Sequence, residues 1–250
     1  MADIVITEFM DEVAVAELAA IRDTLYDPGL VDRPGDLLAA AAACRALIVR
    51  NRTQVRGALL AAASRLVVVG RLGVGLDNID LDACKARSIA VCPATGANDV
   101  SVAEYVIATA MLLLRGAYAS TAAVAAGAWP RTALGEGRET SGRTLGLVGF
   151  GAIARETARR AAALGMTVVA HDPFVPTTDP VWDALSASPR SFDALLAEAD
   201  VISLHVPLTP QTRTMIDAAA IARMRRGAIL INAARGGVVD EAALVAALRA

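Results

Sequence analysis

The sequence has few of the residues that build metal centres, disulfide frameworks and aromatic surfaces. Its 250 residues include two histidines and three cysteines, and aromatic residues make up 4% of the chain. The cysteines Cys44, Cys84 and Cys92 are odd in number and show no C-x-x-C spacing. We therefore expect buried free thiols in a reducing compartment, with neither a disulfide framework nor a metal site.

The chain also lacks a large excess of charge of either sign. Lys and Arg number 24 against 26 Asp and Glu, for a formal net charge of −2, and no basic block occurs. This balance argues against nucleic acid or an anionic membrane as a partner. The opening MADIVITEF lacks the positive region of a signal peptide, and the most apolar stretch, residues 100–114, is shorter than the ~20 residues of a spanning helix. We expect a cytoplasmic protein.

Hydrophobic residues, at 55% of the chain, are plentiful enough for a sizeable core. Up to about Asn98, short apolar runs alternate with amphipathic segments, which predicts βαβ units and a parallel sheet. Pro28 and Pro34 predict loops. Asp99 or Ser101 is expected to cap one long helix that runs to about Ala126. The alternation resumes at Arg143, so we predict two doubly wound α/β domains, residues 1–98 and 99–250.

The stretch RTLGLVGFGAIA, residues 143–154, organises the second domain. An apolar run is followed by Gly149, Gly151 and Ala154 in the spacing G-x-G-x-x-G/A, and a helical pattern comes next. This pattern predicts a tight turn, a close backbone approach to a pyrophosphate, and a helix N-terminus that attracts phosphate. An incidental glycine turn is the alternative.

A second apolar run, TVVAHD, ends in Asp172, which lies 18 positions beyond Ala154. Dinucleotide folds place a ribose-binding carboxylate about 20 residues beyond the glycines. The residues that follow Asp172 are Pro173, Phe174 and Val175, whereas an enzyme that uses NADP needs a basic side chain there. The sequence therefore predicts NAD as the cofactor.

The last segment, DEAALVAALRA from Asp240, is an amphipathic helical pattern without a stop signal. A dinucleotide fold with six strands would still need its last strands at this point. We therefore expect a C-terminally truncated chain in which the return segment of the first domain is also missing.

The motifs LIVRNRTQV, VVGRLGVGLDNID, LGLVGFGAIA with Asp172, SLHVPLTPQTRTMID and LINAARGGVVDEAAL occur together in this order. In this order and spacing they strongly resemble the D-isomer-specific 2-hydroxyacid dehydrogenases, over essentially the whole chain. The resemblance implies a flavodoxin-like substrate domain and a Rossmann domain with NAD(H) between them. It also implies hydride transfer to or from C2 of a 2-oxo acid. A homodimer is expected on a separate ground, the long apolar helix of residues 101–126.

The resemblance implies site roles. Arg235 matches the catalytic arginine, although a structural arginine paired with Asp240 is the alternative. The backbone amides of Gly73, Val74 and Gly75 match the loop that holds the substrate carboxylate, and a plain turn needs the same residues. The positions that match the cofactor site are Val74, Gly149, Gly151, Ala152, Ile153, Asp172, His205, Val206, Pro207, Ala233, Ala234 and Arg235.

One part of the family pattern is missing. The family completes catalysis with a carboxylate and a histidine, both C-terminal to the arginine motif, where the histidine handles the proton of the C2 hydroxyl. Both histidines of this chain, His171 and His205, lie upstream of Arg235 at positions used around the cofactor. Neither is a good candidate for the acid/base role, so the chain carries the cofactor site and half of the catalytic set.

The candidate residues for substrate selection are Arg50, Asn51 and Arg71, which lie at the ends of adjacent predicted strands. Arg50 and Arg71 match positions where phosphoglycerate dehydrogenases place arginines against a distal phosphate, and the opening MADIVITEFMDE is similar to sulfolactate dehydrogenases. Two cations suit a substrate with a second anionic group. The alternative is that these arginines face solvent or pair with acids.

Other classes of function remain open at this stage. The same fold serves NAD(H)-sensing transcriptional corepressors, and an inactive binding module is a further alternative. The long helix with its run VIATAMLLL is either a dimer interface or interdomain core.

Overall fold

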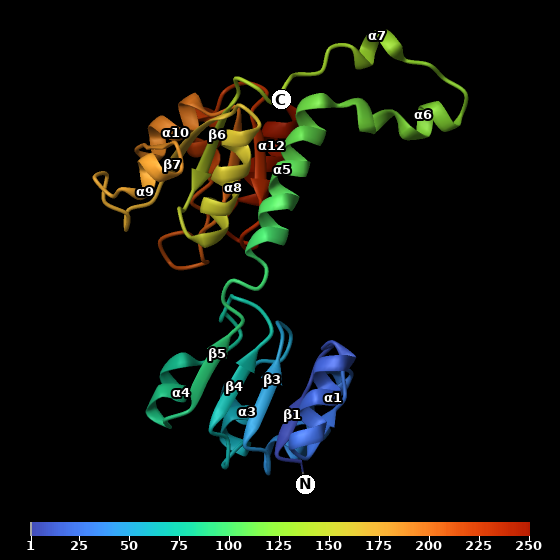
Figure 1. Cartoon of the computed structure of the whole chain (residues 1–250), viewed down its shortest axis with the longest axis vertical. Helices are drawn as coiled ribbons and strands as arrows, with labels where there is room; N and C mark the ends of the chain where they lie inside the picture. The colour runs from blue at the N-terminus through green and yellow to red at the C-terminus, as the bar shows by residue number, and fades with distance from the viewer. Residues whose placement is uncertain (1) are drawn as a thin grey trace. The chain divides into compact units, whose positions relative to one another are not determined.

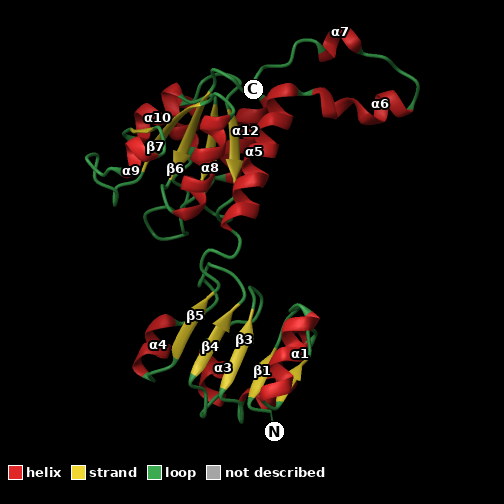
Figure 2. Cartoon of the chain, in the orientation of Figure 1, coloured by secondary structure: helices red, strands yellow, loops and turns green. Residues whose placement is uncertain are grey.

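The computed structural model describes residues 2–250, which fold into two compact units, one up to Asn98 and one from Asp99 to Ala250. Each unit contains one sheet of five strands, and every strand pair in both sheets is parallel. Figure 2 shows these strands in yellow with helices in red beside each sheet. The prediction of two doubly wound α/β units is confirmed.

The first unit has the strand order β2-β1-β3-β4-β5, which is the flavodoxin-like order. Apolar side chains of α2, α3 and α4 pack with Leu47, Val49 and Val69 into one buried cluster, so these helices cover the same face of the sheet. The elements are β1 (Ile4–Ile6), α1 (Glu12–Ile21), β2 (Thr24–Tyr26), η1 (Leu30–Asp32), α2 (Pro34–Ala41), β3 (Ala46–Val49), α3 (Gly57–Ala62), β4 (Val68–Arg71), α4 (Leu81–Ala86) and β5 (Ala90–Pro93).

The second unit has the strand order β10-β9-β6-β7-β8. Leu145 and Leu147 of the central strand face one buried cluster, whereas Val148 faces the other, so the sheet is covered on both sides. The elements are α5 (Asp99–Arg115), η2 (Ala117–Ser120), α6 (Thr121–Ala125), α7 (Arg131–Leu134), β6 (Thr144–Val148), α8 (Ala152–Ala163), β7 (Thr167–His171), α9 (Val181–Ala184), β8 (Ala187–Pro189), α10 (Phe192–Glu198), β9 (Val201–Leu204), α11 (Ala218–Arg223), β10 (Ile229–Asn232) and α12 (Glu241–Arg249).

Two sequence predictions of local structure are wrong. Pro34 begins α2 rather than marking a loop, because proline fits the first helical position, where no amide donor is needed. The expected continuous helix to Ala126 ends at Arg115. Gly116 adopts a left-handed conformation with φ +68°, which stops the helix, and the following helical turns are bent by 68° from it.

Residues 116–136, with η2, α6 and α7, form a segment that we call the arm. Figure 1 shows it extending away from the sheet of the second unit. Its base is closed, because the Arg138 amide donates to the Leu114 carbonyl at 2.8 Å. Any side chain on Gly137 would collide with the Arg115 carbonyl, since an added Cβ would lie 2.3 Å from that oxygen. None of the arm residues is buried.

Within residues 2–250, no single helix combines the length and apolarity needed to cross a membrane; only the bent pair of α5 with residues 117–125 meets both criteria together. The same residues contain no group of three or more His, Cys, Asp or Glu side chains arranged to hold a metal ion.

Candidate functional site

The carboxyl ends of four strands of the second unit converge on one edge of its sheet. The register pairs Val148 of β6 with His171 of β7 and with Leu204 of β9, and Leu204 with Asn232 of β10. The predicted cofactor residues follow these positions directly in the chain. Parallel sheets bind ligands beyond the carboxyl ends of their strands, so the fold brings the predicted set for the second unit together.

The glycine-rich turn after β6 has the geometry that a phosphate group needs. Gly149 has φ +90°, and an added Cβ would lie 2.7 Å from the His205 carbonyl oxygen, so only glycine fits. Gly151 precedes α8 without a side-chain cap, and an added Cβ there would meet no atom within 4 Å. The space beside Gly151 is therefore open next to the N-terminus of α8, where the amides of Ala152 and Ile153 begin the helix, and such a helix start suits a pyrophosphate.

The carboxylate of Asp172 links the end of β7 to this turn. Oδ2 accepts the Phe150 amide at 2.8 Å, and Oδ1 accepts the Phe174 amide at 2.9 Å. An ionised carboxylate offers about four lone-pair positions, so both oxygens retain the capacity to accept a hydroxyl group. This arrangement suits the two hydroxyls of a ribose beside the turn.

A stacked aromatic pair, which sequence reasoning missed, supports this corner of the site. The ring of Phe150 is fully buried and stacks on Trp182, with centroids 4.5 Å apart and planes 12° from parallel. The Trp182 indole donates to the Pro176 carbonyl at 2.8 Å, which ties α9 to the segment after Asp172. The only sequence signal is that Phe150, inside the glycine motif, and Trp182, downstream of it, are two of the chain's few aromatic residues.

His205, at the end of β9, is a half-buried histidine. Its Nε2 lies 2.9 Å from the Ser203 hydroxyl, and its backbone amide donates to the Val148 carbonyl at 2.7 Å. Burial lowers the pKa of its imidazole from 6.5 to about 4, so the ring is neutral at neutral pH. Val206 is half-buried and Pro207 is exposed beside it.

Arg235 lies in a loop that is fixed by Asn232, a residue that sequence reasoning also missed. The Asn232 side chain accepts the Ala234 amide at 3.1 Å and donates to the Arg235 carbonyl at 2.8 Å. Arg235 is half-buried, and its Nη1 donates to the Ala234 carbonyl at 2.9 Å. Asp240 caps α12 through the Ala243 amide at 3.1 Å. Ala233 precedes this turn and is half-buried.

The remaining predicted residues follow the carboxyl ends of β3 and β4 in the first unit. Arg50 is exposed and comes directly after Val49, which pairs with Arg71. The Arg71 side chain fills the space that a side chain on Gly73 would need, since an added Cβ there would lie 1.8 Å from Nη1. The same Nη1 donates to the Leu72 carbonyl at 2.7 Å. Asn51 and Val74 are exposed, and Gly75 is half-exposed on the same loops. Two guanidinium groups thus lie at neighbouring strand ends.

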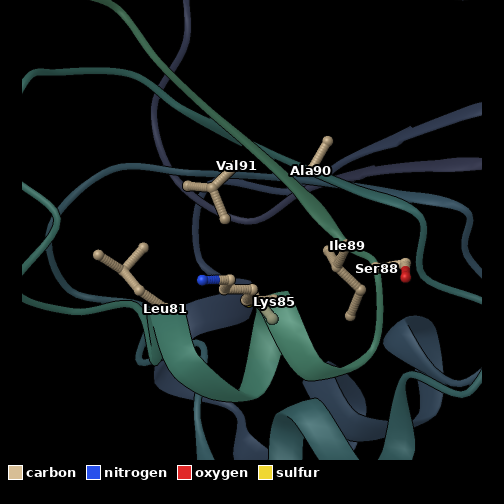
Figure 3. A pocket seen from close by; sticks show the side chains of 7 residues that line it. Leu81, Lys85, Ser88, Ile89, Ala90 and Val91 are labelled. Atoms are coloured by element: carbon tan, nitrogen blue, oxygen red, sulfur yellow. The ribbon is translucent and has the colours of Figure 1, made fainter.

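A cavity of about 420 Å³ lies at a different place in the first unit. Figure 3 shows Leu81, Lys85 and Val91 bordering it, between α4 and β5. It adjoins the beginning of β5, whereas the predicted substrate residues follow the carboxyl ends of β3 and β4. The lining residues are Leu81, Cys84, Lys85, Ser88, Ile89, Ala90 and Val91.

Comparison with known proteins gives a consistent result. Residues 107–250 match the model of the D-isomer specific 2-hydroxyacid dehydrogenase NAD binding domain. The chain is 58% identical to (S)-sulfolactate dehydrogenase of Chromohalobacter salexigens, over 100% of this chain and 80% of that protein. It is 41% identical to D-3-phosphoglycerate dehydrogenase of Mycobacterium leprae, over 99% of this chain and 46% of that protein.

A solved structure agrees with these sequence matches. The fold resembles the D-lactate dehydrogenase of Aquifex aeolicus complexed with NAD and lactic acid, with a TM-score of 0.86 and 30% identity. The similarity covers 98% of this chain and 73% of that one.

The neutral state of His205 generates a prediction about stability and pH. The His205 imidazole takes up a proton near pH 4 in the folded protein but near pH 6.5 in the unfolded chain. Acidification between these values therefore favours unfolding. His205→Gln removes this contribution. The free energy of unfolding of the native protein minus that of the variant, measured in urea, should fall by about 2 kcal/mol from pH 7 to pH 4.5. A difference that stays constant with pH would contradict the neutral assignment.

Proposed function

The chain belongs to the D-isomer specific 2-hydroxyacid dehydrogenase family, and from this premise we propose that its substrate is a 2-hydroxy acid with a second anionic group, of the sulfolactate type. The observation that carries the substrate proposal is the placement of Arg50 and Arg71 at paired strand ends of the first unit. The named relatives, a sulfolactate and a phosphoglycerate dehydrogenase, support it. A 2-hydroxy acid with a sulfonate or phosphate group carries two anionic groups.

The residues of the second unit fit the adenosine and pyrophosphate parts of NAD. We propose that the amides at the start of α8 bind the pyrophosphate, with Gly149 and Gly151 leaving it room, and that Asp172 accepts the ribose hydroxyls. His205, Val206 and Pro207 line the adenine side. Ala233 and Ala234, held by Asn232, adjoin the nicotinamide. When bound, NAD supplies the hydride acceptor or donor.

Arg235 is the catalytic residue of the proposal. Its guanidinium stays charged at every working pH and binds a carboxylate through two parallel hydrogen bonds or stabilises the alkoxide oxygen that develops at C2. The Asn232 turn limits the backbone freedom of Arg235 on both sides, so its charge is presented from a defined position.

The first unit supplies the substrate site in this proposal. The backbone amides of Gly73, Val74 and Gly75 bind the carboxylate next to C2, as consecutive amides in a turn bind anions. Arg50 and Arg71 bind the distal sulfonate or phosphate, with Asn51 beside them. This division lets the same C2 chemistry proceed on a substrate that is selected through its other end.

NADH oxidation with pyruvate, hydroxypyruvate, phosphohydroxypyruvate and sulfopyruvate tests the function and the substrate together. NADH should be oxidised faster with phosphohydroxypyruvate and sulfopyruvate, which carry a second anionic group, than with the other two acids. Arg50→Ala should raise KM for sulfopyruvate about tenfold or more, because a hydrogen bond to a charged group is lost, and should change KM for pyruvate little.

Two results would contradict the proposal. An equal loss for pyruvate and sulfopyruvate in Arg50→Ala would remove the second-anion site. Failure to oxidise NADH with any of the four acids, while NADH still binds, would overturn hydride transfer by this chain and favour a sensing module.

We further propose a homodimer formed by the exposed face of α5 and the arm. Val106, Ala110 and Leu114 on one face of α5 are buried in the unit's own core. Around the rest of the helix, the consecutive apolar residues Met111, Leu112 and Leu113 are exposed to solvent. In the arm, Trp129 is 79% exposed and Tyr118 is 68% exposed. Large contiguous apolar surfaces mark association sites, and in a two-fold dimer the second copy contributes the same apolar surface to the interface.

Sedimentation velocity tests the assembly. The unchanged protein should sediment as a dimer, and the double variant Leu112→Glu with Leu113→Glu should sediment as a monomer, because charge on this face cannot be buried without a partner. Ala19→Glu, an equivalent change on the exposed surface of α1, should leave the dimer intact. A native protein that is monomeric at tens of micromolar would contradict the proposal.

We also infer a reducing, cytoplasmic location. Cys44 and Cys84 are buried free thiols, whereas Cys92 is exposed, so the expectation of a buried thiol is wrong for Cys92. Free thiols of this kind persist where disulfides do not form.

A further inference from the structure

A buried carboxylate lies under the loop that presents Arg50. Glu8 follows β1 and is 5% exposed. Its Oε1 accepts the amides of Arg50 at 2.9 Å and Thr53 at 3.0 Å, and its Oε2 accepts the amide of Arg52 at 3.1 Å. These three hydrogen bonds to the carboxylate therefore all come from one short loop, residues 50–53.

The carboxylate is ionised in spite of its burial. Burial by itself raises the pKa of Glu8, but the hydrogen bonds from Thr53, Arg50 and Arg52 outweigh it and hold the pKa below its ordinary value. No ion pair of Glu8 with a Lys or Arg side chain occurs within the part of the chain that the structure describes. The buried charge is thus balanced by the backbone amides of the loop.

Asn78 fixes the carbonyl groups of the same loop. Its side-chain amide donates to the Thr53 carbonyl at 2.7 Å and to the Arg50 carbonyl at 3.1 Å. The hydroxyl groups of Thr7 and Thr53 lie 2.8 Å apart and add a further link to β1. Because the loop is held through both its amides and its carbonyls, the backbone of Arg50 has little freedom.

The neighbour of Glu8 in the chain positions the side chain of Arg50. The Arg50 guanidinium carbon lies 5.7 Å from the centre of the Phe9 ring, within the range of a cation–π contact. Phe9 itself is 62% exposed, so its ring does not serve the core. Two consecutive residues, Glu8 and Phe9, therefore fix the backbone and the guanidinium of one arginine.

We propose that Glu8 and Phe9 are positioning residues that hold Arg50 ready for the second anionic group of the substrate. The inference rests on the proposed function, in which Arg50 binds that group. A prearranged guanidinium loses less conformational freedom on binding than a mobile one, which strengthens binding without a new contact. Loosening the support should therefore weaken binding of dianionic acids and leave monoanionic acids little affected.

The test compares Phe9→Leu and Glu8→Gln with the unchanged protein. KM and kcat are measured for sulfopyruvate and pyruvate, and sulfopyruvate binding to the protein–NADH complex is measured by calorimetry. Phe9→Leu keeps an apolar side chain but removes the π face, and should weaken sulfopyruvate binding about threefold to fivefold. In Glu8→Gln, one backbone N–H of the loop faces the side-chain NH2 group of glutamine and loses its acceptor. This variant should weaken sulfopyruvate binding about tenfold and speed hydrogen exchange at residues 50–53.

Glu17→Gln is the matched control, because it makes the same chemical change at an exposed position of α1. It should not alter KM for either acid. Equal losses for sulfopyruvate and pyruvate in Glu8→Gln and Phe9→Leu, or a lowered Tm with unchanged KM values, would overturn the positioning role.

Arg50→Ala separates this inference from the proposal beneath it. If Arg50→Ala weakens sulfopyruvate binding but Phe9→Leu and Glu8→Gln do not, the positioning role is wrong and the second-anion site stands. If Arg50→Ala has no effect on sulfopyruvate, the proposed function itself is wrong.

Discussion

The hydrogen bond from the Phe150 amide to the Asp172 carboxylate joins the two halves of the proposed dinucleotide site. Phe150 lies inside the glycine-rich turn, and Asp172 ends the neighbouring strand, so this 2.8 Å contact sets the distance between the phosphate cradle and the acid beside it. Stacking of Phe150 on Trp182 and the indole bond to Pro176 hold both partners in place. The cofactor proposal depends on this geometry, because a dinucleotide must satisfy the turn and the carboxylate at the same time.

The regular elements were predictable where local pattern and tertiary environment agree. The strand Thr144–Val148 is apolar throughout because its sheet is covered on both faces, and the glycine spacing after it specifies the turn. The edge strand Ala187–Pro189 is short and lies after a proline-rich segment, so its pattern carries no strand signal. The break after Arg115 was missed because apolar residues continue on both sides of Gly116, and only its left-handed backbone ends the helix.

The candidate site was predictable in its residue types and in its place at the strand ends, since the direction of parallel strands brings these positions together. The residues that hold the loops were not. Asn78 lies 25 positions from Thr53, and Glu8 lies 42 positions from Arg50, so their contacts arise only when the sheet has formed. Asn232 acts locally, yet an asparagine before a loop is too common to predict which carbonyl it binds.

The cofactor site rests on the proposal that the Asp172 carboxylate selects NAD by accepting the ribose hydroxyls. Calorimetric titration of NADH and NADPH into the native protein and Asp172→Ala tests it most directly, with Asp193→Ala on the exposed surface of α10 as the control. We expect the variant to lose about tenfold or more in affinity for NADH and much less for NADPH, because only NADH presents both ribose hydroxyls. Equal losses for the two dinucleotides would contradict it.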